Sequence, residues 1–240
     1  SVLAMHRLDV LGGLVVRDPQ GARVEPLLAQ PKRAALLAYL AVRGTAVRRD
    51  VLLALFWPDS DMARGRTALR GALHFLRRTL GAAVVVTTGD DEVGVAPAAL
   101  ASDVAAFEAA LAGERLTDAL ALYRGDFLAG VHLSELPELE RWMDGERERL
   151  RRAALAAARR AADAGERRGD PAAALAAVAW AAERFPDDEP TVRRRIALLG
   201  AVGDRAGALR AYEQFAAWLA TEFDAAPAPE TRAARDALLA

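Results

Sequence analysis

Short apolar runs separated by turn-forming residues occupy the beginning of the chain. The segment 8–27, LDVLGGLVVRDPQGARVEPL, is interrupted by Gly12-Gly13 and by the tetrapeptide Asp-Pro-Gln-Gly at 18–21. Apolar runs bounded by glycine and proline are typical of short strands joined by tight turns. The pattern therefore predicts two or three short antiparallel strands that form a small sheet.

At Pro31 the apolar spacing changes to three and four residues, which is the period of an α-helix. A first helix is predicted to begin at Pro31, which suits the first helical position, and to end before Gly44. A second helix is predicted over 49–57, because Pro58 cannot continue it. The residues expected on its buried side are Val51, Leu52, Leu55, Phe56 and Trp57.

A third helix is predicted over 62–80. Asp59 or Ser60 is expected to accept its orphan amide protons, and Gly81 is expected to end it in a left-handed conformation. At about 100° per residue, one side of this helix is apolar and should pack on the first two helices. The apolar side consists of Leu69, Leu73, Leu76 and Leu80.

Two further apolar segments, 83–88 and 92–95, are joined by Gly89-Asp90-Asp91 and predict a hairpin. Strands, three helices and a hairpin follow one another in the order of a winged helix-turn-helix. We therefore expect a winged-helix domain over residues 1–100.

After Pro97 the strand signals disappear, and residues 101–240 are predicted to form an all-α domain, so that the chain as a whole is mainly α. Within this part, GDPAAALAAV at 169–178 and GDRAGALRAY at 203–212 are similar and begin 34 residues apart, which is the tetratricopeptide period. Helix pairs of this kind stack into a solenoid with a groove, and a groove implies a partner. The predicted helices cover 103–111, 115–123, 138–167, 171–185, 188–201, 205–222 and 229–239.

Two other patterns in the helical part have ordinary structural interpretations. The stretch 141–149 alternates charges at spacings of three and four, which is typical of a solvent-exposed, ion-paired helix face. Aromatic residues at helical spacings are expected in the core of the repeats. They are Trp180, Phe185, Tyr212, Phe215 and Trp218.

Basic charge is concentrated in the first part of the chain. Residues 1–100 carry 13 Lys and Arg against 9 Asp and Glu, whereas residues 101–240 carry 19 against 24. Five of the arginines lie within the predicted helix at 62–80, which contains no acidic residue. Such a segment is a candidate surface for phosphate groups.

Opposite its leucines, the third helix presents arginines together with small and polar residues. A helix that enters the major groove needs an apolar back, arginines that pair with guanine or phosphate, and small residues where the backbone comes close. Gly71 costs about 1 kcal/mol of helix stability relative to alanine, which close approach to DNA explains. The candidate DNA-binding residues are Arg64, Arg66, Thr67, Arg70, Gly71, His74, Arg77 and Arg78, with Lys32 and Arg48 near the ends of the first two helices. Their neighbours Arg33 and Arg49 are further candidates outside these ten.

No enzyme chemistry is predicted. The chain has no cysteine, only three widely spaced histidines, and none of the phosphate-loop, G-x-S-x-G or H-E-x-x-H motifs. We therefore expect no catalytic residues, no metal site and no cofactor. No apolar run approaches the length of a membrane span and the start does not read as a signal peptide, so we expect a cytoplasmic protein without membrane contact.

Several segments, taken in order, resemble the Streptomyces antibiotic regulatory protein type of transcriptional activator. That family combines an OmpR-type winged helix with a bacterial transcriptional activation domain. The resemblance covers nearly the whole chain. It rests on PKRAALLAYL, VRRDVLLALFWPD and LRGALHFLRRTLG in the first part, and on SDVAAFEAAL, ALYRGDFLAG, LERWMDGERERL and EFDAAPAPETR in the second.

The resemblance implies that the third helix and the wing bind double-stranded promoter DNA. It also implies that the helical domain supports a homodimer or contacts RNA polymerase or another protein. This chain departs from the family in the wing, where acidic residues at 90–92 replace the usual basic or aromatic tip. Phe75 is a second departure, for which packing on the wing is favoured over contact with a thymine methyl group or a protein.

Two hypotheses follow from these patterns. The first is a DNA-binding transcriptional regulator, for which the resemblance implies activation, although the sequence patterns themselves do not separate an activator from a repressor. The alternative is a protein-interaction scaffold whose winged helix no longer binds DNA, because carboxylates beside phosphates repel.

Overall fold

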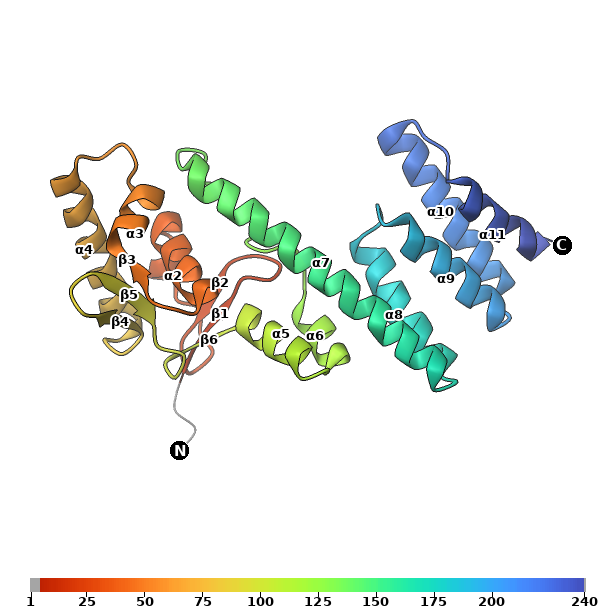
Figure 1. The fold of residues 1–240 in the computed structure, drawn as a ribbon, viewed down its shortest axis with the longest axis horizontal. Coiled ribbons are helices and arrows are strands. Elements are labelled where there is room, and N and C mark those ends of the chain that lie inside the picture. Colours follow the sequence, from red (N-terminus) through yellow and green to blue (C-terminus); the bar gives the residue numbers. More distant parts are fainter. Residues whose placement is uncertain (1–4, 240) are drawn as a thin grey trace. The chain divides into compact units, whose positions relative to one another are not determined.

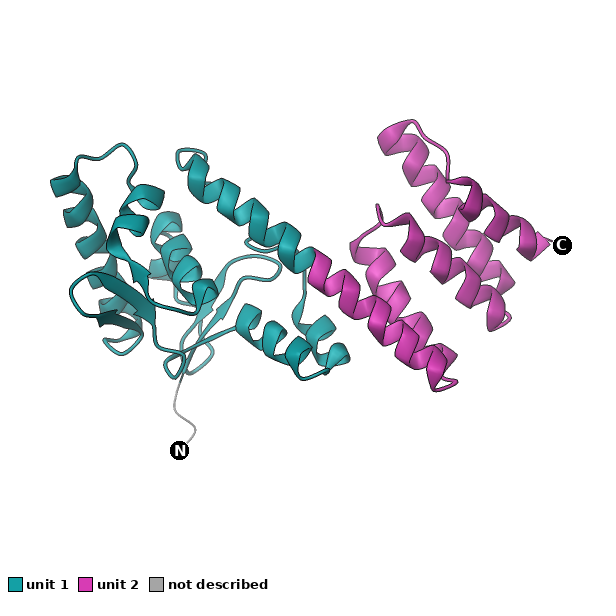
Figure 2. Cartoon of the chain, in the orientation of Figure 1, with its two compact units in different colours: residues 1–151 teal, residues 152–240 magenta. Residues whose placement is uncertain are grey.

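The computed structural model describes residues 5–239, which form two compact units (Figures 1 and 2). The first unit extends to Arg151 and the second begins at Arg152. The long helix α7 (Pro137–Arg167) contributes residues to both units. The units are described separately below.

A three-stranded sheet opens the first unit. Strand β1 (His6–Asp9) pairs antiparallel with β2 (Val15–Arg17), as the sequence predicts, and parallel with β6 (Leu100–Ser102). The expectation that no strand follows Pro97 is therefore wrong. Strand β6 has only three residues and is held by pairing with a segment more than ninety residues away, so its local sequence carries almost no strand signal.

Three helices precede the arginine-rich helix that is predicted over 62–80. The short α1 (Glu25–Leu28) is not expected from the sequence, whereas α2 (Pro31–Arg43) and α3 (Arg49–Phe56) lie where the pattern predicts them. Helix α2 ends at Gly44, whose φ of +64° is the left-handed cap that glycine adopts at low cost. Val51 does not lie on the buried side of α3, because it is 40% exposed.

Helix α4 (Met62–Leu80) packs through the predicted leucines, since Leu69, Leu73, Leu76 and Leu80 are all buried. Its N-terminal cap is neither Asp59 nor Ser60. Asp61 accepts the hydrogen bond from the Arg64 amide at 2.9 Å. The helix ends at Gly81 with φ +94° and ψ 149°, so the positive φ is present without the left-handed helical conformation.

A second three-stranded sheet forms the wing. The predicted hairpin consists of β4 (Val85–Thr88) and β5 (Glu92–Val95), and β5 also pairs with the two-residue strand β3 (Val47–Arg48). The strand order is β3-β5-β4. Two small sheets, three principal helices and this hairpin confirm the winged helix-turn-helix fold.

The rest of the first unit is helical and packs on the winged helix. It comprises α5 (Asp103–Ala112), α6 (Leu116–Leu122) and the beginning of α7. Trp142 of α7 lies edge-on to Tyr39 of α2, with ring centroids 4.6 Å apart. Arg147 donates a hydrogen bond to the Phe127 carbonyl at 2.9 Å. The stretch 141–149 is therefore not simply a solvent-exposed face, because part of it docks on the winged helix.

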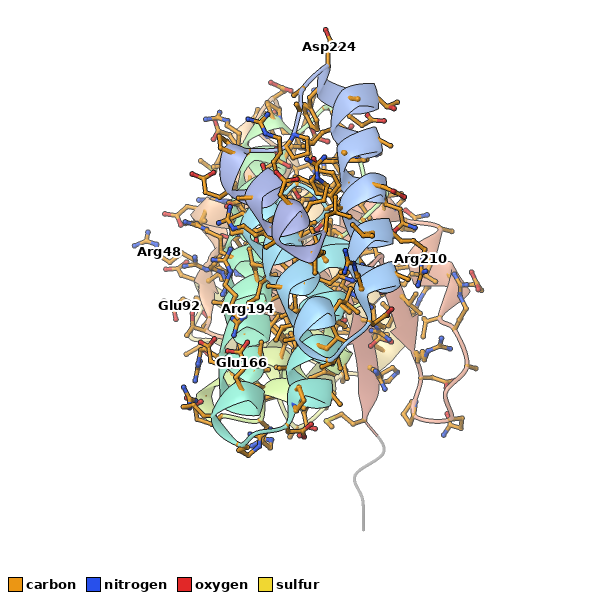
Figure 3. The ribbon with its side chains drawn as sticks, turned by 90° about the vertical axis from the view of Figure 1, so that its right-hand side faces the viewer. Arg48, Glu92, Glu166, Arg194, Arg210 and Asp224 are labelled. Atoms are coloured by element: carbon orange, nitrogen blue, oxygen red, sulfur yellow. The ribbon has the colours of Figure 1, made fainter. Side chains whose placement is uncertain are left out.

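The second unit continues with α8 (Pro171–Arg184), α9 (Glu189–Ala201), α10 (Arg205–Phe223) and α11 (Pro229–Leu239). These helices lie close to the predicted ranges and confirm an all-α, tetratricopeptide-like domain. Arg194 of α9 pairs with Glu166 of α7 at 3.0 Å (Figure 3). Phe185, Tyr212 and Phe215 are buried as expected, while Trp180 and Trp218 are only partly buried.

The sequence repeat corresponds to one repeated helix start. Asp170 caps α8 by accepting from the Ala173 amide, and Asp204, 34 residues later, caps α10 by accepting from the Gly207 amide. Each is preceded by a glycine with positive φ, Gly169 at +68° and Gly203 at +84°. The motif Gly-Asp thus turns the chain from one helix into the next in both repeats.

Candidate nucleic-acid interface

Helix α4 presents a polar face that no other element covers. Opposite its buried leucines lie Thr67, Gly71 and His74, all solvent-exposed, with Arg64 and Arg78 on the same face and also exposed. A Cβ built on Gly71 meets no atom within 4 Å. The face is therefore open to a large ligand along four turns of the helix.

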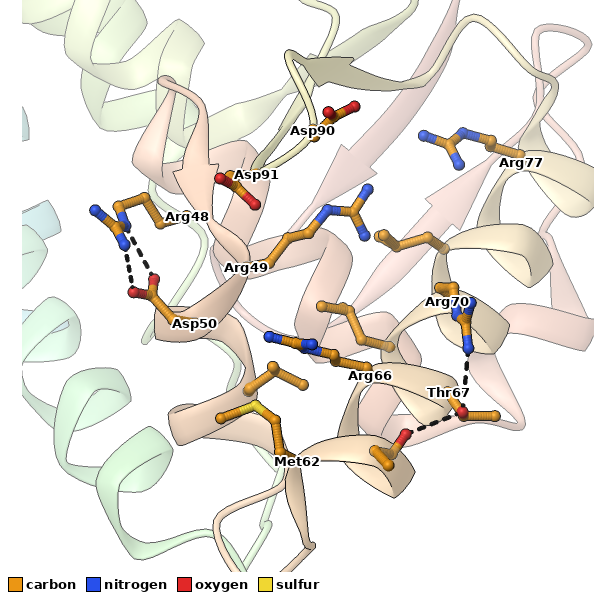
Figure 4. A pocket seen from close by; sticks show the side chains of 14 residues that line it. Arg48, Arg49, Asp50, Met62, Arg66, Thr67, Arg70, Arg77, Asp90 and Asp91 are labelled. Atoms are coloured by element: carbon orange, nitrogen blue, oxygen red, sulfur yellow. Dashed lines mark hydrogen bonds and ion pairs between the residues drawn. The ribbon is translucent and has the colours of Figure 1, made fainter.

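Beside this face is a cleft of about 1060 Å³, bounded by the start of α3, one flank of α4 and the turn of the wing. Figure 4 shows Arg49, Arg66, Arg70 and Arg77 around it. Arg48 also lines the cleft, as do the acidic residues Asp50, Asp90 and Asp91. Five arginines thus share one concave surface, which suits a polyanion.

The arginines of α4 differ in the hydrogen bonds and ion pairs that their guanidinium groups form within the protein. Arg64 pairs with Asp61 at 3.2 Å, but both side chains are more than half exposed, so this pair is weak. Arg70 donates a hydrogen bond to the Thr67 hydroxyl at 3.3 Å. Within residues 5–239, Arg66, Arg70 and Arg78 form no ion pair with a carboxylate. These three guanidinium groups are available for phosphate or base edges.

Arg77 connects α4 to the wing through two hydrogen bonds. Its Nε donates to the Val85 carbonyl at 3.1 Å and its Nη2 to the Thr87 hydroxyl at 2.8 Å. Both acceptors belong to β4. The side chain therefore fixes the hairpin against α4, and its remaining donors face the cleft.

Two candidates from the first helices lie in different surroundings. Arg48 lines the cleft and forms two hydrogen bonds with Asp50, at 2.7 and 3.1 Å. These bonds, together with the charges of Asp50, Asp91 and Glu92, raise the pKa of Arg48. Lys32 does not line the cleft. Its Nζ lies 5.0 Å from the centre of the Trp57 ring, and burial lowers its pKa against the opposing charges of Glu135 and Asp59.

The ten sequence-predicted residues thus fall into three places. Arg48, Arg66, Thr67, Arg70 and Arg77 meet at the cleft. Arg64, Gly71, His74 and Arg78 lie on the outer face of α4, and Lys32 lies on α2 beside Trp57. Phe75 packs under Arg33, whose guanidinium lies 4.4 Å from the ring centre. The sequence favours packing of Phe75 on the wing, whereas the ring contact that the structure shows is with Arg33 of α2.

Other residues of the cleft include Arg49, which the sequence also offers as a candidate, and Met62, which it does not. Met62 is 60% exposed at the beginning of α4 and lines the cleft. Arg49 also lines it and donates its backbone amide to the Asp91 carbonyl at 2.7 Å. The basic pair Arg48-Arg49 was a signal for both arginines, but nothing local to Met62 marked its exposure.

A sequence profile identifies the family. The profile of the bacterial transcriptional activator domain matches residues 93–239. The chain belongs to this family. The match covers more than half of the sequence and includes all helices from α5 to α11.

The bacterial transcriptional activator domain accounts for the helical part, and the winged helix precedes it. This order is that of the Streptomyces antibiotic regulatory protein type, so the resemblance seen in the sequence is confirmed. The description of the family associates this domain with transcriptional activation. The family profile begins inside the wing, and the two compact units divide after Arg151. Neither position coincides with residue 100, so a domain boundary there stays a prediction.

One solved structure supports the fold of the whole chain. Mycobacterium tuberculosis EmbR, solved in complex with a low-affinity phosphopeptide, is similar with a TM-score of 0.62 and 23% sequence identity. The similarity covers 98% of this chain and 64% of the EmbR chain, so the present sequence spans less than two thirds of that protein. No curated protein matches the sequence.

No group of three or more His, Asp or Glu side chains within residues 5–239 could hold a metal ion. No helix in the same range is long and apolar enough to cross a membrane.

Proposed function

We propose that this protein is a transcription regulator that binds double-stranded promoter DNA with α4 in the major groove and acts as an activator. The observation that carries the proposal is the uncovered polar face of α4, where Arg66, Arg70 and Arg78 form no ion pair with a carboxylate of residues 5–239 and lie opposite a buried row of leucines. A helix with this arrangement can enter the major groove, because its leucine side is packed on the core of the domain.

Each part of the face has its own expected role. Arg70 and Arg78 are suited to bidentate pairing with guanine O6 and N7, or with a phosphate. Thr67 and His74 offer shorter polar groups between them. Arg48, Arg66 and Arg77, along the cleft, are placed to contact the sugar-phosphate strand beside the groove. Lys32 is the candidate with the least support, because it does not line the cleft.

The helical domain is proposed to contact a protein. A tetratricopeptide-like stack provides a surface for RNA polymerase, another protein or a second copy of the chain. EmbR was solved with a phosphopeptide, and a peptide ligand for this chain is a proposal of the same kind. Because promoter DNA lies in the cytoplasm, the proposal places the protein there.

The test is selection of binding sites from random duplexes with the purified protein, followed by fluorescence anisotropy on the selected duplex. We expect a salt-dependent affinity, and Arg70→Ala or Arg78→Ala should weaken binding by about 1–3 kcal/mol if the residue contacts a base. Arg210→Ala is the matched control. Arg210 is also an exposed arginine on a helix, but it belongs to α10 of the second unit (Figure 3).

If no sequence is enriched and no duplex binds at low salt, the proposal is wrong. One observation then favours the scaffold hypothesis, namely the acidic turn of the wing at Asp90 and Asp91 beside the arginines. A stoichiometric protein partner, bound by the full chain in the absence of DNA binding, would support that alternative.

A further inference from the structure

The turn of the wing is acidic and its position is fixed from two sides. Asp90 and Asp91 are exposed at the tip, and Glu92 follows as the first residue of β5. The Arg49 amide donates to the Asp91 carbonyl at 2.7 Å, and Glu92 stands opposite Arg48 in the β3–β5 pair. On the other side, Arg77 holds β4 through Val85 and Thr87. The tip is therefore held on the scaffold that carries the arginines.

The carboxylates of the tip belong to the wall of the arginine cleft. Asp90 and Asp91 line it together with Arg48, Arg49, Arg66, Arg70 and Arg77 (Figure 4). With Asp50, three aspartates stand among five arginines, so the lining has a formal charge of +2. Without Asp90 and Asp91 the same lining would carry +4.

Nonspecific and specific DNA binding respond differently to this charge. Binding to an arbitrary sequence depends almost entirely on cations that neutralise phosphates. Recognition of a particular sequence adds hydrogen bonds to base edges, which do not depend on the charge of a neighbouring wall. A duplex of arbitrary sequence settles where the most cations meet its phosphates, which is the arginine cleft, whereas base contacts fix the register of a specific duplex on α4. Repulsion at the wall of the cleft therefore weakens the nonspecific complex more than the specific one.

We infer that Asp90 and Asp91 are specificity determinants, which lower the affinity of the arginine cleft for DNA of arbitrary sequence. This inference rests on the proposed function. It gives the acidic wing a role in DNA recognition, where the sequence alone presented it as an obstacle. Base reading stays with the side chains of α4, and the carboxylates of the tip keep the cleft from binding any duplex tightly.

The test compares the wild-type chain with the double variant Asp90→Asn, Asp91→Asn. Asparagine keeps the shape of the side chain, suits turns and removes only the charge. The control is Glu213→Gln, Glu222→Gln, which makes the same change in net charge at two exposed residues of α10. Anisotropy is measured on the selected duplex and on a scrambled duplex over a series of salt concentrations, and circular dichroism verifies the fold of each variant.

We expect the wing variant to bind the scrambled duplex about tenfold more tightly at low salt, with a steeper salt dependence, and to show a smaller rise on the selected duplex. The ratio of the two affinities then falls. The control should leave that ratio unchanged.

An unchanged affinity for the scrambled duplex, or an equal rise on both duplexes, would overturn the inference while leaving the proposed function intact. If neither the wild type nor the wing variant binds either duplex at low salt, the proposed function fails, and the inference fails with it.

Discussion

Arg124 donates a hydrogen bond to Asp103 at 3.1 Å, and through this contact the loop after α6 is tied to the first residue of α5. The Asp103 carboxylate is fully buried and also accepts the backbone amides of Val10 and Leu11, just beyond β1, at 2.9–3.0 Å. Arg124 in turn reaches Asp9 at 3.1 Å. One carboxylate thus joins the first sheet of the winged helix to the first helices of the activator domain.

Replacing Asp103 by alanine should destabilise the protein by about 3 kcal/mol, because two buried amides and one arginine lose their acceptor. Asp103→Asn should cost less, since one acceptor oxygen remains. The measurement is urea unfolding followed by tryptophan fluorescence. Asp118→Ala, which removes an exposed carboxylate paired with Arg115, is the control and should cost less than about 1 kcal/mol. Equal losses for Asp103 and Asp118 would contradict this account.

A pH-dependent contribution to stability is expected from Asp188. Burial raises the pKa of this carboxyl, but hydrogen bonds from Thr191 and Arg159 outweigh burial, and the pKa lies below its ordinary value of 3.8. A carboxyl whose pKa is lower in the folded protein stabilises it above the unfolded pKa, and this stabilisation is lost as the pH falls through the folded pKa.

The wild type should therefore be more stable than Asp188→Asn at pH 7, by about 1 kcal/mol, and the difference should shrink below about pH 4. Urea unfolding of both proteins across this range measures it. Asparagine keeps the N-terminal cap of α9, so that the comparison isolates the charge that Arg159 pairs with. A difference that stays constant down to pH 2 would show that the charge is not responsible.

Elements built from local contacts could be predicted from the sequence, and elements held by distant partners could not. The repeat at Gly169 and Gly203 is an example of the first kind, because a positive-φ glycine and a capping aspartate act within one helix start. Strands β3 and β6 are examples of the second kind. Each is only two or three residues long and exists because a strand far along the chain pairs with it.

The candidate site shows the same division. Helical periodicity was sufficient to separate the buried leucines of α4 from its exposed arginines. It could not show that Arg77 holds β4 or that Arg33 covers Phe75, because both contacts join different elements. It also could not show that Trp142, in a stretch rich in charges, docks on Tyr39. Such pairings are set by tertiary packing, and the local sequence pattern contains no information about them.

Arg77 and Arg78 are neighbours in the sequence and should differ in their effect on the wing. Arg77→Ala removes the hydrogen bonds to Val85 and Thr87, so the amides of β4 should exchange faster with solvent. Arg78→Ala removes an exposed side chain without such contacts and should leave exchange unchanged. Hydrogen–deuterium exchange with mass spectrometry measures both.

On DNA, both variants should lose affinity, but only the first should also loosen the wing. If β4 exchanges at the same rate in both variants, the hairpin does not depend on Arg77, and the contact with Thr87 has no role in holding the wing.

Gly71 offers a prediction in which stability and binding change in opposite directions. It lies inside α4, exposed, with open space where a Cβ would stand. Gly71→Ala should therefore stabilise the protein by about 0.5–1 kcal/mol, because alanine favours the helix and restricts the unfolded chain. If DNA approaches the backbone of α4 at this point, the added methyl group should weaken binding to the selected duplex severalfold. Thermal unfolding and anisotropy measure the two effects.

Gly145 supplies the matched control. It is also an exposed glycine inside a long helix, α7, and a Cβ built there likewise meets nothing within 4 Å. Gly145→Ala should give the same stabilisation without any change in DNA affinity. Because a general effect on the fold would move both variants together, a loss of binding confined to Gly71→Ala locates the duplex at the outer face of α4. If Gly71→Ala is stabilised and binds as well as the wild type, close approach of DNA to this residue is wrong.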